Sequence, residues 1–179
     1  MDIVGLLDNK TLKSLDKRAE LIEAIRMEAI TIHEIQFLKA VLDDKKMAVI
    51  LEAIEAISLK NPGIADSDWL KFAQEYITSK SNSLKREASR IVGNIAHLFP
   101  DDLELAIQKL LENTNNDGTV IRWSSAYALG RIISIPEYAS SDLFDVISGL
   151  YELETDNGVK NQYLYGIKKA LKTRVLLIK

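Results

Sequence analysis

The 179-residue sequence contains no cysteine and only two histidines. The absence of cysteine excludes disulfides, thiolate zinc sites and cysteine nucleophiles, and it agrees with a reducing compartment. His33-Glu34 begins like the H-E-x-x-H zinc motif but lacks its second histidine. The chain also has no glycine-rich phosphate loop and no G-x-S-x-G nucleophile motif. We therefore expect no metal, no cofactor and no enzymatic activity.

Long apolar runs and an excess of basic residues are missing as well. The first eight residues hold only a short apolar run between two aspartates, which is too short for a signal peptide. No run approaches the ~20 apolar residues of a membrane span, so we expect no membrane association and a cytoplasmic location. The net charge of −3 argues against non-specific nucleic-acid binding as the main activity. The length and the hydrophobic content of 47% suit a single domain over residues 1–179.

Apolar residues recur at helical spacing, and strand signals are scarce, which predicts an all-α protein. The clearest helix spans residues 117–134, where Ile121, Ser125, Ala128, Leu129 and Ile132 share one face. The other predicted helices span residues 10–29, 31–42, 45–59, 66–78, 83–98, 100–112, 140–153 and 159–174. The aromatic residues of the helix at 66–78, Trp69, Phe72 and Tyr76, have helical spacing and are expected in the core.

Four of these helices align with one another, starting at Val49, Leu84, Ile121 and Val159. The starts differ by 35, 37 and 38 residues (84−49, 121−84 and 159−121). A period of this length, with two helices in each unit, is typical of an α-solenoid. One hairpin cannot bury its apolar face alone, so consecutive hairpins stack. An irregular helical bundle with chance periodicity is the alternative.

The repeat that begins at Ile121 carries the motif of a known family. Asp117 lies in the preceding turn, and Ile121-Arg122 is followed by Ser125, then by Ala128-Leu129-Gly130. This resembles the turn Asp and the V-R-x-x-A-x-x-A-L-G helix of HEAT-repeat (armadillo-like) proteins, and it is most similar to the short repeats of the phycobilisome-lyase group. The resemblance covers residues 30–172. It implies a right-handed α-solenoid of about four HEAT-like helical hairpins plus an N-terminal helix.

The resemblance also implies roles for individual residues. Asp117 and Arg122 are expected to form a structural turn-to-helix pair that links hairpins. In such solenoids the second helices line the concave face. If the first aligned residue of each repeat is position 0, positions 2, 6, 9 and 13 lie opposite the buried face. The candidate groove residues at these positions are Arg86, Arg90, His97, Trp123, Tyr127, Tyr165, Lys168 and Lys172.

Aromatic residues and arginine together are typical of protein-binding hot spots. The candidate function is therefore a non-enzymatic scaffold or adaptor that binds a partner protein through the concave groove, as an assembly factor or a toxin-sequestering immunity protein would. Half-buried packing of Trp123 and Tyr127 between helices is the alternative interpretation of that pair. The acidic side chains Glu52 and Glu55 are expected at the other end of the same groove.

Two other functions stay open at this stage. The chain could bind nucleic acid, as the HEAT-like DNA glycosylases for alkylated bases do. It could also be a bilin lyase or chaperone, as the resemblance to the phycobilisome-lyase group implies. The apolar run at residues 175–178 is expected either to fold back on the last hairpin or to contact another chain, which leaves the oligomeric state open.

Overall fold

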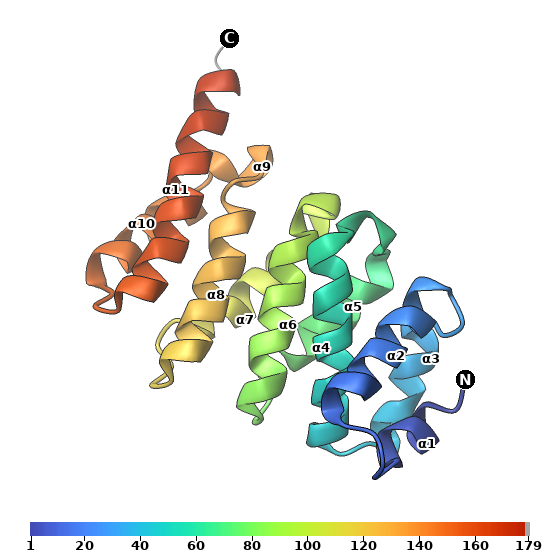
Figure 1. Cartoon of the computed structure of the whole chain (residues 1–179). Coiled ribbons are helices and arrows are strands. Elements are labelled where there is room, and N and C mark those ends of the chain that lie inside the picture. The colour runs from blue at the N-terminus through green and yellow to red at the C-terminus, as the bar shows by residue number, and fades with distance from the viewer. Residues whose placement is uncertain (178–179) are drawn as a thin grey trace.

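The computed structural model describes residues 1–177 and consists, over that range, of helices joined by short turns. The helices follow one another from the N-terminus to the C-terminus as stacked hairpins, with the termini at opposite ends (Figure 1). The α-helices are α1 (Ile3–Asp8), α2 (Ser14–Arg26), α3 (Ile32–Phe37), α4 (Asp44–Lys60), α5 (Ser67–Tyr76), α6 (Asn82–Ile95), α7 (Glu104–Asn113), α8 (Thr119–Ile132), α9 (Pro136–Ala139), α10 (Asp142–Leu153) and α11 (Asn157–Leu177).

The helices form two layers. Helices α2, α4, α6, α8 and α11 lie side by side in chain order, and each packs on the next (Figure 1). Helices α3, α5, α7 and α10 form the second layer, where α5 packs on α6, α7 on α8 and α10 on α11. The expected stack of four hairpins, α3–α4, α5–α6, α7–α8 and α10–α11, is confirmed.

Local capping signals explain where several of these helices begin. The Thr31 hydroxyl accepts a hydrogen bond from the Glu34 amide, and the Glu34 carboxylate accepts one from the Thr31 amide. This reciprocal pair is the capping box expected from the sequence. Asp43 and Asp66 cap α4 and α5 with their carboxylates, which accept hydrogen bonds from backbone amides of the first turn. These caps set the starts of helices whose apolar faces then meet across the layers.

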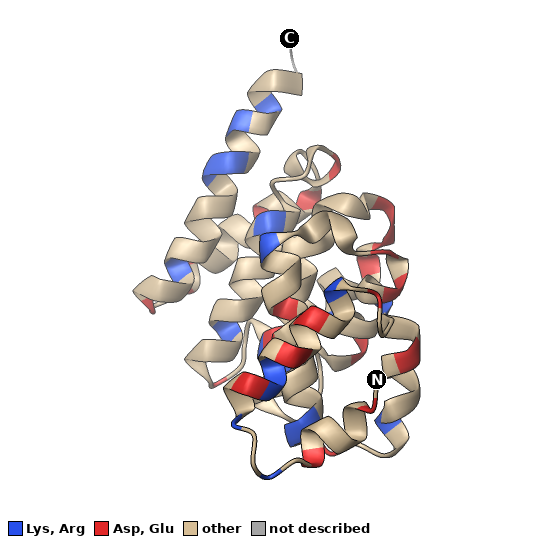
Figure 2. Cartoon of the chain, turned by 45° about the vertical axis from the view of Figure 1, so that its right-hand side comes forward, with Lys and Arg blue, Asp and Glu red and all other residues tan. Residues whose placement is uncertain are grey.

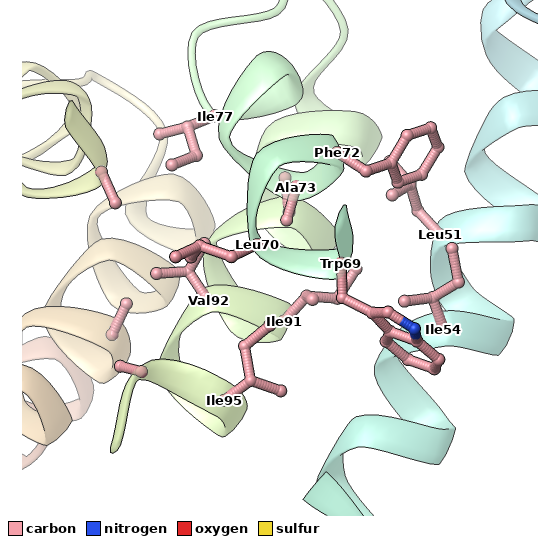
Figure 3. Close-up of a cluster of buried hydrophobic side chains, with 14 of the residues drawn as sticks. Leu51, Ile54, Trp69, Leu70, Phe72, Ala73, Ile77, Ile91, Val92 and Ile95 are labelled. Carbon is pink, nitrogen blue, oxygen red and sulfur yellow. The ribbon is translucent and has the colours of Figure 1, made fainter. Parts of the chain in front are cut away.

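The core lies between the two layers. Trp69 and Phe72 of α5 point toward α4, where Leu51 and Ile54 are buried (Figure 3). Tyr76 is half buried and packs against the same core. The aromatic residues of α5 are therefore core residues, as their spacing predicts. The apolar face of α8, from Ile121 to Ile132, is buried as well.

Two parts of the chain differ from the sequence-based expectation. The N-terminal helix expected over residues 10–29 is present as the shorter α2, and α1, which precedes it with a turn between them, was not expected. The Asn9 carboxamide accepts a hydrogen bond from the Thr11 amide in that turn, which ends one helix before the next begins. The short helix α9 was not expected either. Within residues 1–177, no helix is both long enough and apolar enough to cross a membrane.

Helices α8 and α11 approach each other closely at two glycines. A Cβ atom on Gly166 would lie 2.3 Å from the Gly130 carbonyl oxygen and 2.4 Å from the Gly130 Cα. Only glycine fits at Gly166, because any side chain there would collide with backbone. This contact holds the last hairpin against the third and brings the C-terminal half of α11 alongside the end of α8.

Candidate binding groove

A groove of about 700 Å³ lies where the C-terminal ends of α6 and α8 meet α9 and α11. We call it the C-terminal groove. Its floor is made by Asn94, Tyr127 and Arg131, and its wall on α11 by Tyr165, Lys169 and Lys172. Cavities of this volume are in the range that accommodates a small ligand or a short segment of another chain.

A hydrogen-bond chain across three helices builds the floor. The Asn94 side chain on α6 donates to the Ser58 hydroxyl on α4 at 3.0 Å. The Tyr127 hydroxyl on α8 donates to Asn94 Oδ1 at 2.5 Å. Burial raises the pKa of Tyr127, so its hydroxyl stays protonated and remains a donor. Gly93 makes room for the ring, since a Cβ there would lie 2.8 Å from Tyr127 Cδ1.

The guanidinium of Arg131 lies over the Tyr127 ring. Its Cζ is 3.3 Å from the centroid of the Tyr127 ring, and its Nη1 donates to the Tyr127 carbonyl at 3.2 Å. The Tyr165 ring centroid is 5.4 Å from the same Cζ. Burial lowers the pKa of Arg131, but a guanidinium remains charged in proteins. Among residues 1–177 no carboxylate forms an ion pair with Arg131, so its charge faces the groove unneutralised.

The wall on α11 adds further positive charge. Lys169 Nζ lies 4.8 Å from the centroid of the Tyr165 ring, and Lys172 follows one turn later. Helix α11 carries five basic residues and no acidic one. Blue bands along this helix mark them in Figure 2. Among residues 1–177, Glu137 on α9 is the one acidic residue that lines the groove, and the lining cations Arg131, Lys169 and Lys172 outnumber it.

The eight candidate groove residues do not all line one surface of the structure. Four of them, His97, Tyr127, Tyr165 and Lys172, line the C-terminal groove. Arg86 and Arg90 lie in an adjacent ion cluster, and Lys168 is exposed outside the groove. The structure thus places half of the candidate residues around one cavity.

The ion cluster joins Arg86 and Arg90 of α6 to three glutamates. Arg90 Nη2 lies 2.7 Å from Glu55 Oε1, and Arg90 Nη1 lies 3.4 Å from Glu87 Oε2. Arg86 Nε donates to Glu87 Oε1 at 2.5 Å, and its Nη2 lies 3.6 Å from Glu52. Both arginines are therefore neutralised within the protein.

Glu55 was expected on the groove surface, but its residue exposure is only 7%. Burial raises the pKa of Glu55, and the positive charge of Arg90 opposes that shift. The expected acidic end of the groove is therefore a largely buried internal ion pair. The reason is that Glu55 faces α6, one helix further along the layer, rather than solvent.

Trp123 stacks on Tyr127, with ring centroids 5.4 Å apart and ring planes 26° apart. It is half buried and packs against the core, near Gly158 at the start of α11. This arrangement matches the alternative in which the aromatic pair fills the space between helices. Trp123 supports the Tyr127 ring, whereas Tyr127 itself reaches the groove.

Asn94, Arg131 and Lys169 line the groove with polar or charged side chains but were not among the candidates. They share a register, because each lies at position 10 of its repeat (84+10, 121+10 and 159+10), and so does Leu59 (49+10), which also lines the groove. Position 10 lies four residues after position 6 and three before position 13, on the same helix face. The repeat alignment therefore contained the signal that identifies them.

Arg122 links two hairpins, but its ionic partner is not Asp117. Arg122 Nε lies 2.9 Å from Glu154 Oε2, and its Nη2 donates to Glu154 Oε1 at 3.3 Å. Asp117 contributes only its backbone carbonyl, which accepts from Arg122 Nη1 at 3.2 Å. The hydrogen bond from Arg122 lowers the pKa of the Glu154 carboxyl. The pairing expected with the Asp117 carboxylate is wrong, since Glu154 of the next hairpin presents a bidentate partner.

The fold of the chain is similar to that of two solved structures. No family model and no curated protein matches the sequence. Among solved structures, the chain is similar to one from "the complex of CpcE and CpcF of phycocyanin lyase from Nostoc sp. PCC7120". The TM-score is 0.64 at 18% identity, over 92% of this chain and 96% of that chain. It is also similar to an engineered protein, with a TM-score of 0.51 at 18% identity, over 98% of this chain and 84% of that one. The chain therefore has the helical-repeat fold of the phycocyanin lyase structure, in agreement with the resemblance of its repeats.

Proposed function

We propose that the protein is a non-enzymatic binding module that holds a segment of a partner protein in the C-terminal groove. The observation that carries this proposal is the unneutralised guanidinium of Arg131, stacked on the aromatic floor of a groove of about 700 Å³. Aromatic residues and arginine in a partly desolvated pocket are the composition of binding hot spots.

The state of the groove's polar groups favours recognition over catalysis. The hydroxyls of Tyr127 and Ser134 donate to Asn94 and to the Gly130 carbonyl, and the Asn94 amide donates to Ser58. These neutral groups are engaged within the protein and serve its structure. The charged groups are the ones that face the cavity, and they suit electrostatic recognition of a partner.

An affinity capture from a lysate of the source organism tests the proposal. The wild type is compared with a Tyr165→Ala/Lys169→Ala variant, which removes two exposed groove side chains. A Lys80→Ala variant is the control, because Lys80 is an exposed lysine in the turn before α6. We expect a protein retained by wild type and control but lost from the groove variant. Equal retention by all three would place the site elsewhere, and retained nucleic acid would favour a nucleic-acid binding protein instead.

A subunit of a bilin lyase, or a chaperone of that type, is the second candidate. It is favoured by the match to the phycocyanin lyase complex, which extends over nearly the whole of both chains. The same neighbour is a complex of two proteins, which supports a protein partner for this chain too. Mixing the purified protein with a free bilin tests the second candidate, because an unchanged absorption spectrum would remove it.

A further inference from the structure

We propose that Arg131 binds a carboxylate of the occupant, and that the apolar rim of the groove takes an apolar side chain of the same segment. This inference rests on the proposed function and names the chemistry that the groove selects. The occupant is an extended segment of a partner protein that carries an aspartate, a glutamate or a chain-terminal carboxylate close to an apolar residue.

Arg131 is held ready for such a ligand before it arrives. Its guanidinium is held in place by the contact with the Tyr127 ring and by the hydrogen bond from Nη1 to the Tyr127 carbonyl. Guanidinium donors form a rigid fork that matches a carboxylate, and one edge of this fork is not used by the Tyr127 carbonyl. Because its orientation is fixed, little side-chain entropy is lost on binding.

The surroundings of Arg131 favour an anion over a neutral group. Lys169 and Lys172 line the same cavity from α11, and His97 lines it from the helical turn after α6. Glu137 opposes them with one negative charge from α9 and forms no ion pair with the groove cations among residues 1–177. Three permanent cations against one carboxylate leave the groove complementary to an acidic segment.

The repeat register arranges these groups in order across the helix layer. Position 10 of the four repeats is Leu59 on α4, Asn94 on α6, Arg131 on α8 and Lys169 on α11. The residue type thus changes from apolar to amide to guanidinium to ammonium along one row of the groove. A carboxylate is favoured between Arg131 and Lys169, where the charges are adjacent.

An apolar rim borders the charged row on its C-terminal side. It consists of Pro100, Ile135, Pro136 and Leu176. Leu176 is 71% exposed although it is a leucine, so the rim offers apolar surface that is not covered within residues 1–177. Along α11, Leu176 lies seven residues after Lys169 and four after Lys172, which corresponds to about 6–10 Å of helix.

That distance sets the spacing expected in the ligand. An extended chain advances about 3.3 Å per residue, so 6–10 Å corresponds to two or three residues. We therefore expect the carboxylate and the apolar side chain of the occupant two or three positions apart. A basic segment, or one without an apolar residue at this spacing, does not match both halves of the groove.

Selection of random peptides by display on the immobilised full-length protein tests this inference. We expect the wild type to enrich peptides with Asp, Glu or a terminal carboxylate two or three positions from an apolar residue. The affinity of a selected peptide for an Arg131→Gln variant should fall at least about tenfold, because a charge-assisted contact is lost. The affinity of Arg131→Lys for the same peptide should lie between those of the wild type and Arg131→Gln, since lysine keeps the charge but not the forked donors of arginine. Arg26→Gln, an exposed arginine on α2, should bind like the wild type.

Changing the peptide instead of the protein separates the inference from effects on folding. A peptide whose carboxylate is replaced by an amide should bind the wild type more weakly by the same factor as the Arg131→Gln substitution causes. The affinity of the amide peptide should fall little further when Arg131→Gln replaces the wild type. Enrichment of neutral or basic peptides, of no peptide at all, or equal binding by Arg131→Gln would overturn the carboxylate assignment. If lysate capture still depends on Tyr165 and Lys169 in that case, the proposed function survives and only the chemistry assigned to Arg131 fails.

Discussion

The Tyr127 hydroxyl and the Asn94 carboxamide form a hydrogen bond of 2.5 Å between α8 and α6. Both residues are buried, and the Tyr127 ring is the surface on which the Arg131 guanidinium lies. Asn94 is in turn bonded to Ser58 on α4. The position of the proposed carboxylate-binding arginine therefore depends on a bond chain through three consecutive repeats.

Removing the Tyr127 hydroxyl should destabilise the protein without removing the ring. In Tyr127→Phe the buried Asn94 oxygen loses its donor, which typically costs about 1–3 kcal/mol of unfolding free energy. Urea denaturation measures this difference. Tyr151→Phe is the matched control, because Tyr151 is half buried and no hydrogen bond of its hydroxyl is formed within residues 1–177. Equal stability of the two variants would show that the 2.5 Å bond contributes nothing.

The contact between Gly130 and Gly166 predicts that adding one methyl group at Gly166 strongly lowers the stability of the protein. Gly166→Ala places a Cβ 2.3 Å from the Gly130 carbonyl oxygen, so α11 must move away from α8. We expect a loss of about 1–3 kcal/mol or more in unfolding free energy. Gly149→Ala on α10 meets no atom within 4 Å, and it should stabilise the protein by about 0.5–1 kcal/mol. Thermal or urea unfolding of the pair decides this, and a stabilising Gly166→Ala would contradict the close approach.

The Arg122–Glu154 pair predicts a pH-dependent contribution to stability. The pKa of Glu154 is lowered in the folded protein by its hydrogen bond to Arg122. A lowered pKa means that the contribution is present above the unfolded value of about 4.3 and is lost as pH falls through the folded pKa. Glu154→Gln should therefore cost about 1–3 kcal/mol at neutral pH, and its difference from wild type should shrink below about pH 4.

Chemical denaturation of both proteins between acidic and neutral pH measures this difference. Glu112→Gln, at an exposed glutamate on α7, should match the wild type throughout. A Glu154→Gln difference that is constant with pH would mean that the ion pair is not the source of the stability.

The ion cluster and the groove should respond differently to mutation. Arg90→Gln leaves the buried carboxylate of Glu55 without its ionic partner and leaves Glu87 paired with Arg86 alone. It should lower the unfolding free energy by about 1–3 kcal/mol, whereas peptide binding in the groove should stay at the wild-type level. Both the unfolding free energy and the peptide affinity are measured on the Arg90→Gln variant. A variant that keeps its stability but loses binding would move the site toward Arg90, where the sequence alone placed it.

The repeat pattern predicts what is buried better than what is exposed. The face from Ile121 to Ile132 was identified because a helix repeats every 3.6 residues, and that period acts within one helix. The partner of Arg90 lies on the preceding inner helix, and the partner of Arg122 lies in the next hairpin. Such pairings depend on the register between helices, which no single helix pattern contains.

The repeat pattern predicts some of the groove residues but not all of them. Tyr127 and Tyr165 at position 6 and His97 and Lys172 at position 13 are among the candidate residues, and the structure brings them to one cavity. Arg131 at position 10 lies between these two positions along the helix axis. It does not lie directly opposite the buried face, so the positions chosen from the repeat pattern do not include it. The turn at residues 9–13 depends on local side-chain hydrogen bonds, which the apolar pattern does not show.

Site-specific crosslinking tests directly whether the partner occupies the C-terminal groove, and the absence of cysteine makes it simple. Glu137→Cys places a single thiol in the groove, and Glu152→Cys places one on the exposed surface of α10 with the same change of charge. Each variant is labelled with a photoreactive maleimide and mixed with the captured partner or a selected acidic peptide. A crosslink is expected from position 137 and none from position 152. Crosslinking from position 152 alone would show that the partner binds the other layer, and it would contradict the groove as the binding site.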